Sequence, residues 1–249
     1  MAQAYKISHA ETYKKGVAQF IHSNRETLLY QLLSDLNLPN KGQLADFGCS
    51  DGYIIENLRK TVFAGKDWRY VGLDHAQKLI DLGIAKKLPN TTFGIADLNV
   101  INHQFESQYD VVLCLETLEH VGDYANALEN LYLAAKVDGD IIITIPNEVG
   151  LPGFVKYAAR RILRRDAYGD FFKGKSEWKY MKHLLTGKPI DMFRQPAQDS
   201  WGPHLGFDSN SFHAFIMQEL VDKGKVNMIQ YFKTDRVGFN IFYHLKRLI

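Results

Sequence analysis

The chain has 249 residues, of which 46% are hydrophobic and 23% are charged, as in an ordinary globular protein. No window approaches 18 consecutive apolar residues, which argues against a membrane-spanning helix, and the N-terminus lacks the apolar core of a signal peptide. The two cysteines, Cys49 and Cys114, lie in apolar segments typical of buried thiols in a reducing compartment. The sequence therefore predicts a cytoplasmic protein.

The net charge of +2 is unevenly distributed. Residues 151–190 carry ten lysines and arginines but three acidic residues, so this segment holds +7 and the rest of the chain −5. A basic block on an acidic body suggests that the block has a role of its own.

Residues 1–40 are predicted to be helical, because apolar residues recur at helical spacing from Val17 to Leu36. The segment LPNKG at 38–42 ends this pattern. Strands and helices then alternate, and the apolar strands indicate a parallel sheet covered on both faces. In chain order we predict a strand at 43–47, a helix at 53–63, a strand at 69–73, a helix at 76–87, strands at 91–96 and 109–115, a helix at 124–137 and a strand at 140–145.

The alternation stops at Gly150 and resumes near Gly206. Asp208 or Ser209 can cap a helix that runs to about Lys223. Strands at 225–233 and 237–245 follow, and the three residues between them predict an antiparallel hairpin. The sequence thus predicts N-terminal helices over 1–40, a ligand-binding α/β domain over 41–147 and 206–249, and an inserted subdomain over 148–205.

The strongest functional signal is the segment LADFGCSDGY at 44–53, which joins a strand to a helix. Gly48 and Gly52 permit a tight turn and close approach of a ligand, and the helix N-terminus offers free N–H groups. Its spacing is G-x-x-x-G rather than the dinucleotide pattern G-x-G-x-x-G, and Asp46 precedes the first glycine by two residues. An acid at that position suits a ligand with an ammonium group better than a pyrophosphate.

Two further acids follow the next two strands. Asp74 comes 26 residues after Gly48, close to the spacing at which an acid binds ribose hydroxyls in doubly wound folds. Asp97 ends the third strand, where a carboxylate can accept a hydrogen bond from an adenine amino group. Ligands of open α/β sheets bind at the carboxyl ends of the strands, so three acids at those ends indicate one site.

These motifs, with YDVVLCLETLEHV at 109–121, resemble class I S-adenosylmethionine-dependent methyltransferases, and most closely their ubiquinone-biosynthesis-type small-molecule O-methyltransferase branch. The resemblance implies a doubly wound, Rossmann-like, mostly parallel sheet of seven strands that ends in the antiparallel hairpin, with the insertion after the fifth strand. It also implies S-adenosyl-L-methionine as cofactor. The residues expected to bind the cofactor are Asp46, Gly48, Cys49, Ser50, Asp74, His75, Asp97, Leu98, Leu115 and Glu116.

One departure from the family pattern G-x-G-x-G lies in the loop itself, where Cys49-Ser50 replaces x-G. The backbone must then pass the cofactor with a side chain at Ser50, which can donate a hydrogen bond instead.

The cluster Glu116-x-x-Glu119-His120 after the fourth strand is the predicted catalytic loop. In one interpretation His120 is a general base beside an acceptor hydroxyl, since imidazole titrates near neutrality. In a second, the cluster supplies metal ligands, as in small-RNA 2′-O-methyltransferases, whose motif adds a distant histidine. In a third, Glu119 and His120 only cap the next helix. His204 lies in the glycine- and proline-containing loop WGPHLGF, so the candidate catalytic residues are His120, Glu119 and His204, and no metal site is assigned.

The predicted reaction is O-methylation of a small-molecule, sugar or lipid-linked acceptor. One alternative is a metal-assisted RNA 2′-O-methyltransferase that uses Glu116, Glu119, His120 and His204, although the near-zero net charge makes a nucleic-acid partner unlikely. Another is a non-catalytic protein that binds S-adenosylmethionine.

The insertion over 148–205 is expected to cap the acceptor site, with its aromatic residues walling an apolar pocket. Its helix at 154–165 has Phe154, Val155, Ala158 and Ile162 on one face and basic residues elsewhere. Such a helix can contact an anionic acceptor or a membrane surface, or its basic residues can simply face water. The oligomeric state stays open.

Overall fold

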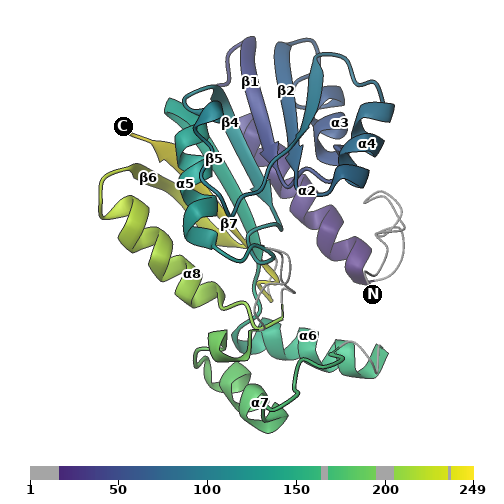
Figure 1. The fold of residues 1–249 in the computed structure, drawn as a ribbon, viewed down its shortest axis with the longest axis vertical. Coiled ribbons are helices and arrows are strands. Elements are labelled where there is room, and N and C mark those ends of the chain that lie inside the picture. The colour runs from purple at the N-terminus through teal and green to yellow at the C-terminus, as the bar shows by residue number, and fades with distance from the viewer. Residues whose placement is uncertain (1–16, 164–167, 195–204, 235–236) are drawn as a thin grey trace.

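The computed structural model describes residues 17–163, 168–194, 205–234 and 237–249. Within them the chain forms a seven-stranded sheet in the order β3-β2-β1-β4-β5-β7-β6. Strands β1 to β5 are parallel, whereas β7 runs antiparallel to both β5 and β6 (Figure 1). The predicted α/β fold is confirmed. The strands are β1 (Lys41–Phe47), β2 (Asp67–Asp74), β3 (Thr91–Ile95), β4 (Tyr109–Leu115), β5 (Ala135–Pro146), β6 (Val226–Lys233) and β7 (Asn240–Arg247).

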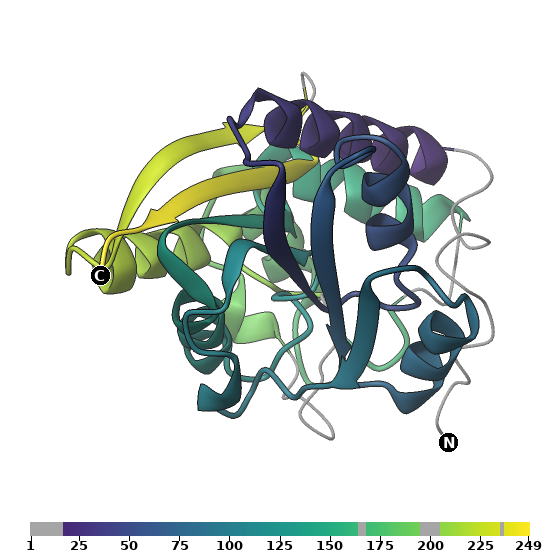
Figure 2. The same cartoon turned by 90° about the horizontal axis from the view of Figure 1, so that it is seen from above.

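Helices cover both faces of the sheet, because the central strands are apolar on both sides. In β4, Val111 and Leu113 belong to one buried cluster and Val112 and Cys114 to the other. The first cluster is completed by α2 (Val17–Asp35), α3 (Tyr53–Lys60) and α4 (Gln77–Ala85). The second is completed by α5 (Tyr124–Ala134) and α8 (Ser209–Ile216), and Figure 2 shows α2 on the opposite side of the sheet from α5.

The helix–strand boundary at α5 differs from the prediction. The helix ends at Ala134, three residues before the predicted end, and Ala135 pairs with Tyr109 as the first residue of β5. Asp138 adopts a positive φ of 62°, so the Asp-Gly pair turns a bulge within the strand rather than stopping the helix.

At the C-terminal half, the predicted cap of α8 is confirmed, since the Asp208 carboxylate accepts hydrogen bonds from the N–H groups of Asn210 and Ser211. The helix continues into a π-helical turn, η3 (Met217–Val221). The predicted hairpin is also confirmed, but β7 begins at Asn240 rather than Val237. The Thr234 N–H donates to the carbonyl of Asn240, and the Asn240 N–H donates to the Thr234 hydroxyl, which closes the hairpin before Val237 can pair. Two residues of the predicted turn, 235–236, lie outside the described residues.

The insertion contains α6 (Gly150–Leu163), α7 (Glu177–Thr186) and the short 3₁₀ helix η2 (Asp191–Phe193). Figure 1 places α6 and α7 together beyond the end of β5. Most of the aromatic residues that are described in it pack against each other, whereas Trp178 is 72% exposed. Trp201 lies outside the described residues, and the role of the insertion as a cap stays a prediction. The buried cluster of the insertion consists of Val149, Tyr157, Tyr168, Phe171, Tyr180, Leu184, Ile190, Phe193 and Leu205.

The predicted faces of the insertion helix are wrong in part. Ile162, expected on the packed face of α6, is 78% exposed. Lys156 and Arg160 turn inward and pair with Glu148, which is 1% exposed. A buried acid from outside the helix attracts these cations and reverses the face that the periodicity indicated. Arg164 and Arg165 lie outside the described residues, and none of the described helices has the length and hydropathy to cross a membrane.

Candidate active site

The glycine loop leaves β1 in a left-handed turn. Gly48, Ser50 and Gly52 have φ values of 84°, 53° and 74°, so the chain takes the tight turn that the sequence predicts. A Cβ atom on Gly48 would lie 2.1 Å from Oγ1 of Thr117, and one on Gly52 would lie 2.5 Å from the ring of Phe93. The missing side chains of both glycines therefore make room for protein side chains, which lock the loop against β3 and the segment after β4.

Asp74 holds the same loop from the end of β2. The Ser50 N–H donates to Oδ2 of Asp74 at 2.9 Å, so the backbone of Ser50 fixes the loop to the end of β2. A hydrogen bond from the Ser50 hydroxyl to the cofactor stays a prediction. Oδ1 of Asp74 accepts the N–H of Ala76 at 2.9 Å and lies 3.2 Å from Nδ1 of His75. A carboxylate has about four lone-pair sites, so the chemistry of Asp74 still fits a ribose hydroxyl.

Asp46 lies beneath the loop and is 2% exposed. Burial, together with the nearby charge of Asp74, raises the pKa of Asp46 to about 7. A cation beside this carboxyl would restore its ionised form, which fits the ammonium group of S-adenosylmethionine. Cys49 is buried next to it, and burial raises the pKa of that thiol well above its usual value.

Asp97, predicted to bind adenine, and two further residues predicted to bind the cofactor have surroundings that favour this role less clearly. Asp97 is exposed, and its Oδ1 accepts hydrogen bonds from the backbone and side-chain nitrogens of Asn99 at 2.9 and 2.7 Å. Leu98 is 3% exposed and packs in the core shared with α5 and α8. Leu115 is partly buried against the opposite cluster.

Glu116 begins the catalytic loop, which we define as residues 116–121. Its backbone has a positive φ of 50°, and its N–H donates to the carbonyl of Thr144 on β5 at 2.9 Å. Arg25 reaches Glu116 from α2, with 3.5 Å between Nη1 and Oε2, and is 6% exposed. Arg25 belongs to no sequence motif, and its partner lies 91 residues further along the chain, so no local pattern indicates this contact.

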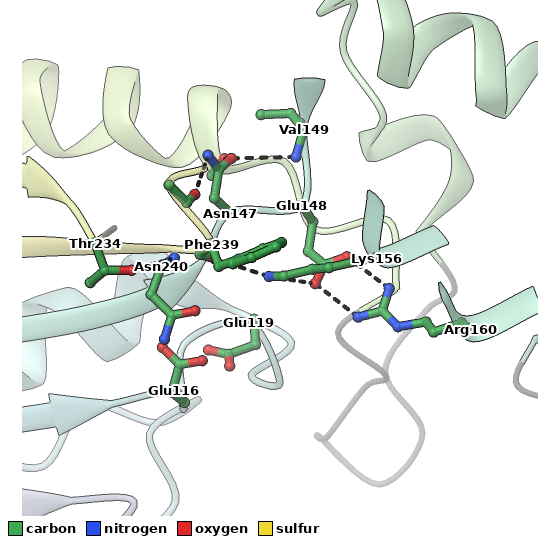
Figure 3. A network of polar contacts seen from close by, with 12 residues as sticks. Glu116, Glu119, Asn147, Glu148, Val149, Lys156, Arg160, Thr234, Phe239 and Asn240 are labelled. Atoms are coloured by element: carbon green, nitrogen blue, oxygen red, sulfur yellow. Dashed lines mark hydrogen bonds and ion pairs between the residues drawn. The ribbon is translucent and has the colours of Figure 1, made fainter. Parts of the chain in front are cut away.

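Glu119 and His120 differ sharply in their surroundings. Glu119 is 2% exposed, and burial, reinforced by the charge of Glu116, raises its pKa well above the usual value. Figure 3 shows the side chains of Glu116 and Glu119 next to each other. The His120 side chain is 39% exposed, with Nε2 3.9 Å from Oε1 of Glu119. The loop therefore presents one accessible imidazole above a buried, readily protonated carboxyl group.

The described residues contain no group of three histidine, cysteine, aspartate or glutamate side chains arranged to hold a metal ion. Glu116, Glu119 and His120 would need a further ligand, and the histidine suggested for that role, His204, lies outside the described residues. Its catalytic assignment therefore stays a prediction.

Polar contacts also join the end of β5, the helix α6 and the hairpin at this edge of the sheet. Lys156 pairs with Glu148 and donates to the carbonyl of Phe239 at 3.0 Å, which ties α6 to the hairpin (Figure 3). Asn147 donates to the carbonyl of Gly238 at 2.9 Å. Asn240, the first residue of β7, is 2% exposed at the same edge of the sheet.

Residues 17–187 match a protein family described as a methyltransferase domain. The chain belongs to this methyltransferase family. The match confirms the resemblance drawn from the glycine loop and the catalytic loop, and it supports S-adenosylmethionine as the cofactor.

Among curated proteins, the ubiquinone biosynthesis O-methyltransferase of Rickettsia bellii is 28% identical over 147 residues, which cover 57% of this chain and 59% of that protein. The chain thus spans about three fifths of that relative's length. The Rickettsia akari protein of the same name is 26% identical over 230 residues, with coverage of 85% and 88%.

Solved structures agree in fold. A putative S-adenosylmethionine-dependent methyltransferase from Listeria monocytogenes has a TM-score of 0.58 at 14% identity, covering 92% of this chain and 100% of that one. The magnesium protoporphyrin IX methyltransferase of Synechocystis, solved with bound SAH, has a TM-score of 0.56 at 16% identity, with coverage of 94% and 90%.

Proposed function

We propose that this methyltransferase transfers the methyl group of S-adenosylmethionine to a hydroxyl group of a small-molecule acceptor. The observation that carries the proposal is the accessible imidazole of His120 on the loop after β4, above the buried carboxyl of Glu119. This loop lies at the carboxyl ends of the strands, where Asp46 and Asp74 also lie. An imidazole at that edge is a suitable base for an acceptor hydroxyl.

Each cofactor residue has a role that its surroundings support. Asp46 binds the ammonium group, because a cation offsets the unfavourable burial of its charge. Asp74 accepts the ribose hydroxyls while it holds the loop through Ser50. Asp97 accepts the adenine amino group from the exposed end of β3. The remaining cofactor contacts predicted from the sequence stay part of this proposal.

When bound, S-adenosylmethionine supplies a methyl group that its sulfonium already activates. The chain therefore has to align the acceptor and handle one proton. His120 accepts the proton of the acceptor hydroxyl at Nε2 as the methyl group is transferred. Burial raises the pKa of Glu119, which disfavours a full negative charge on this carboxyl beside the acceptor.

The names of the Rickettsia relatives support O-methylation, and a hydroxyl acceptor is the chemistry for which a base such as His120 is needed.

We further propose that the insertion, residues 148–205, caps the acceptor site and that the acceptor is lipid-linked. Leu151, Val155 and Ile162 on α6 are 64%, 39% and 78% exposed, and their spacing of four and seven residues places them on one stripe. An exposed apolar stripe of this kind can insert into a membrane surface. Lys156 and Arg160 of the same helix pair with Glu148 inside the protein, so they do not provide such a contact. The buried free thiols support a cytoplasmic location.

The test is methyl transfer from labelled S-adenosylmethionine to a panel of hydroxyl acceptors that includes polyprenylated phenols. His120→Ala should lower turnover by about 10²–10⁴-fold with little change in cofactor affinity, since only proton removal is lost. His103→Ala, at an exposed site outside the catalytic loop, is the matched control. Unchanged turnover in His120→Ala would refute its role as base. Activity lost on chelation and restored by a divalent metal would instead support the metal-assisted alternative.

A further inference from the structure

An arginine of the insertion, Arg194, forms hydrogen bonds to the backbone of the catalytic loop. Nη2 of Arg194 donates to the main-chain carbonyls of Glu119 at 2.7 Å and Val121 at 2.9 Å. These two carbonyls lie on either side of His120 in the chain. A single guanidinium therefore fixes the backbone before and after the candidate base.

Arg194 is itself held firmly. Its N–H donates to the carbonyl of Asp191 at 2.9 Å, which closes the turn of η2. Its guanidinium lies over the ring of Phe207, 5.3 Å from the centroid. The backbone of Gly206 passes so closely that a Cβ there would lie 2.7 Å from the nitrogen of Arg194. Phe193, the preceding residue, is buried in the aromatic core of the insertion.

The partners of this arginine are unusual for a residue that serves only stability. Among the described residues no carboxylate lies within ion-pair distance of Arg194, and burial lowers its pKa despite the opposing charge of Asp191. Burying a cation without a paired anion costs free energy, which its hydrogen bonds to the loop must offset. In contrast, Arg161 of α6 is paired directly with Glu177.

We propose that Arg194 is a positioning residue through which the insertion sets the catalytic loop, and with it the orientation of His120, for reaction with the acceptor. The insertion has its own core, so its packing is transmitted to the loop as one unit through this side chain. The proposal rests on the proposed function only where it concerns turnover. The effect on the loop itself does not depend on the identity of the acceptor.

The experiment compares Arg194→Met, which keeps the aliphatic stem, with Arg194→Lys and with the matched control Arg161→Met. Hydrogen exchange is measured at the His120 amide, which donates to the carbonyl of Thr117 inside the loop. Loss of charge-assisted bonds to two carbonyls should speed exchange there by roughly tenfold to a hundredfold in Arg194→Met. Arg194→Lys should fall between Arg194→Met and the wild type, and Arg161→Met should match the wild type.

Two further measurements separate positioning from a general loss of structure. The pKa of the His120 imidazole, followed by NMR, should shift in Arg194→Met, whereas calorimetric affinity for S-adenosylmethionine should stay within about twofold. With an acceptor in hand, kcat should fall more than KM rises. Equal exchange and an equal His120 pKa in Arg194→Met and wild type would overturn the proposal, even if methyl transfer is confirmed. If Arg194→Met does not fold, the exchange rate and the His120 pKa of Arg194→Lys are compared with those of the wild type, and equal values would overturn the proposal. Altered exchange without any methyltransferase activity would leave the positioning role standing and count against the proposed function.

Discussion

Replacing Glu148 by Gln should destabilise the chain more than any comparable loss of surface charge. The Glu148 carboxylate is 1% exposed, accepts two hydrogen bonds of 2.9 Å from Arg160, and lies 3.2 Å from Nζ of Lys156. Burial alone would lower the pKa of Arg160, but the charge and hydrogen bonds of Glu148 raise it overall. Gln keeps the shape of the side chain and leaves two largely buried cations without their anion.

Breaking a buried ion pair from one side costs about 3–5 kcal/mol. For a chain of this size each kcal/mol lowers the Tm by about 2–4 °C, so calorimetry should find a decrease of roughly 6–20 °C. Glu177→Gln is the control, because its pair with Arg161 is about one third exposed and worth less than about 1 kcal/mol. If the two variants have the same Tm, the Glu148 cluster is solvated in solution and the reasoning from burial fails.

Two further predictions concern the cofactor acids. Asp74→Ala should weaken binding of S-adenosylmethionine by about tenfold to a hundredfold, because charge-assisted hydrogen bonds to the ribose are lost. The affinity is measured by calorimetry. Asp81→Ala, on the exposed side of α4, is the control and should bind the cofactor normally. The raised pKa of Asp46, about 7 against 3.8 for the free side chain, means that the native chain retains a proton that the unfolded chain releases. Stability of the cofactor-free protein should therefore fall as pH rises from about 4 to 7, and urea unfolding of Asp46→Asn should lack this part of the slope.

The sheet could be predicted because its strands carry the signal locally. The segment YDVVLCL at 109–115 is apolar on both faces, and β4 occupies the same residues. The end of α5 could not be placed, because Asp138-Gly139 is a turn signal for a helix stop and for a strand bulge alike. The pairing of Ala135 with Tyr109 decided between them, and that contact is not local.

The glycine loop and the loop after β4 could be proposed as site segments from the sequence for the same reason, since each is a contiguous motif. Arg25, Arg194 and Asn240 were missed because each reaches the site from a distant element and has no pattern around it. For α6, the periodicity argument assumed that charges face water. That assumption failed where Glu148, outside the regular helical pattern, offered Lys156 and Arg160 a buried partner.

The two cysteine thiols can be labelled chemically, and each reports on a different opening motion of the chain. Cys49 lies in the glycine loop at 4% exposure, and its Sγ would be 2.9 Å from a Cβ on Gly72. Cys114 has no exposed surface and lies near the end of β4, under α5 and α8. Alkylation of Cys49 requires only that the loop lift away from β2, whereas alkylation of Cys114 requires the core between the sheet and the helices α5 and α8 to open. The rate of modification at each cysteine therefore separates local opening of the cofactor loop from global unfolding.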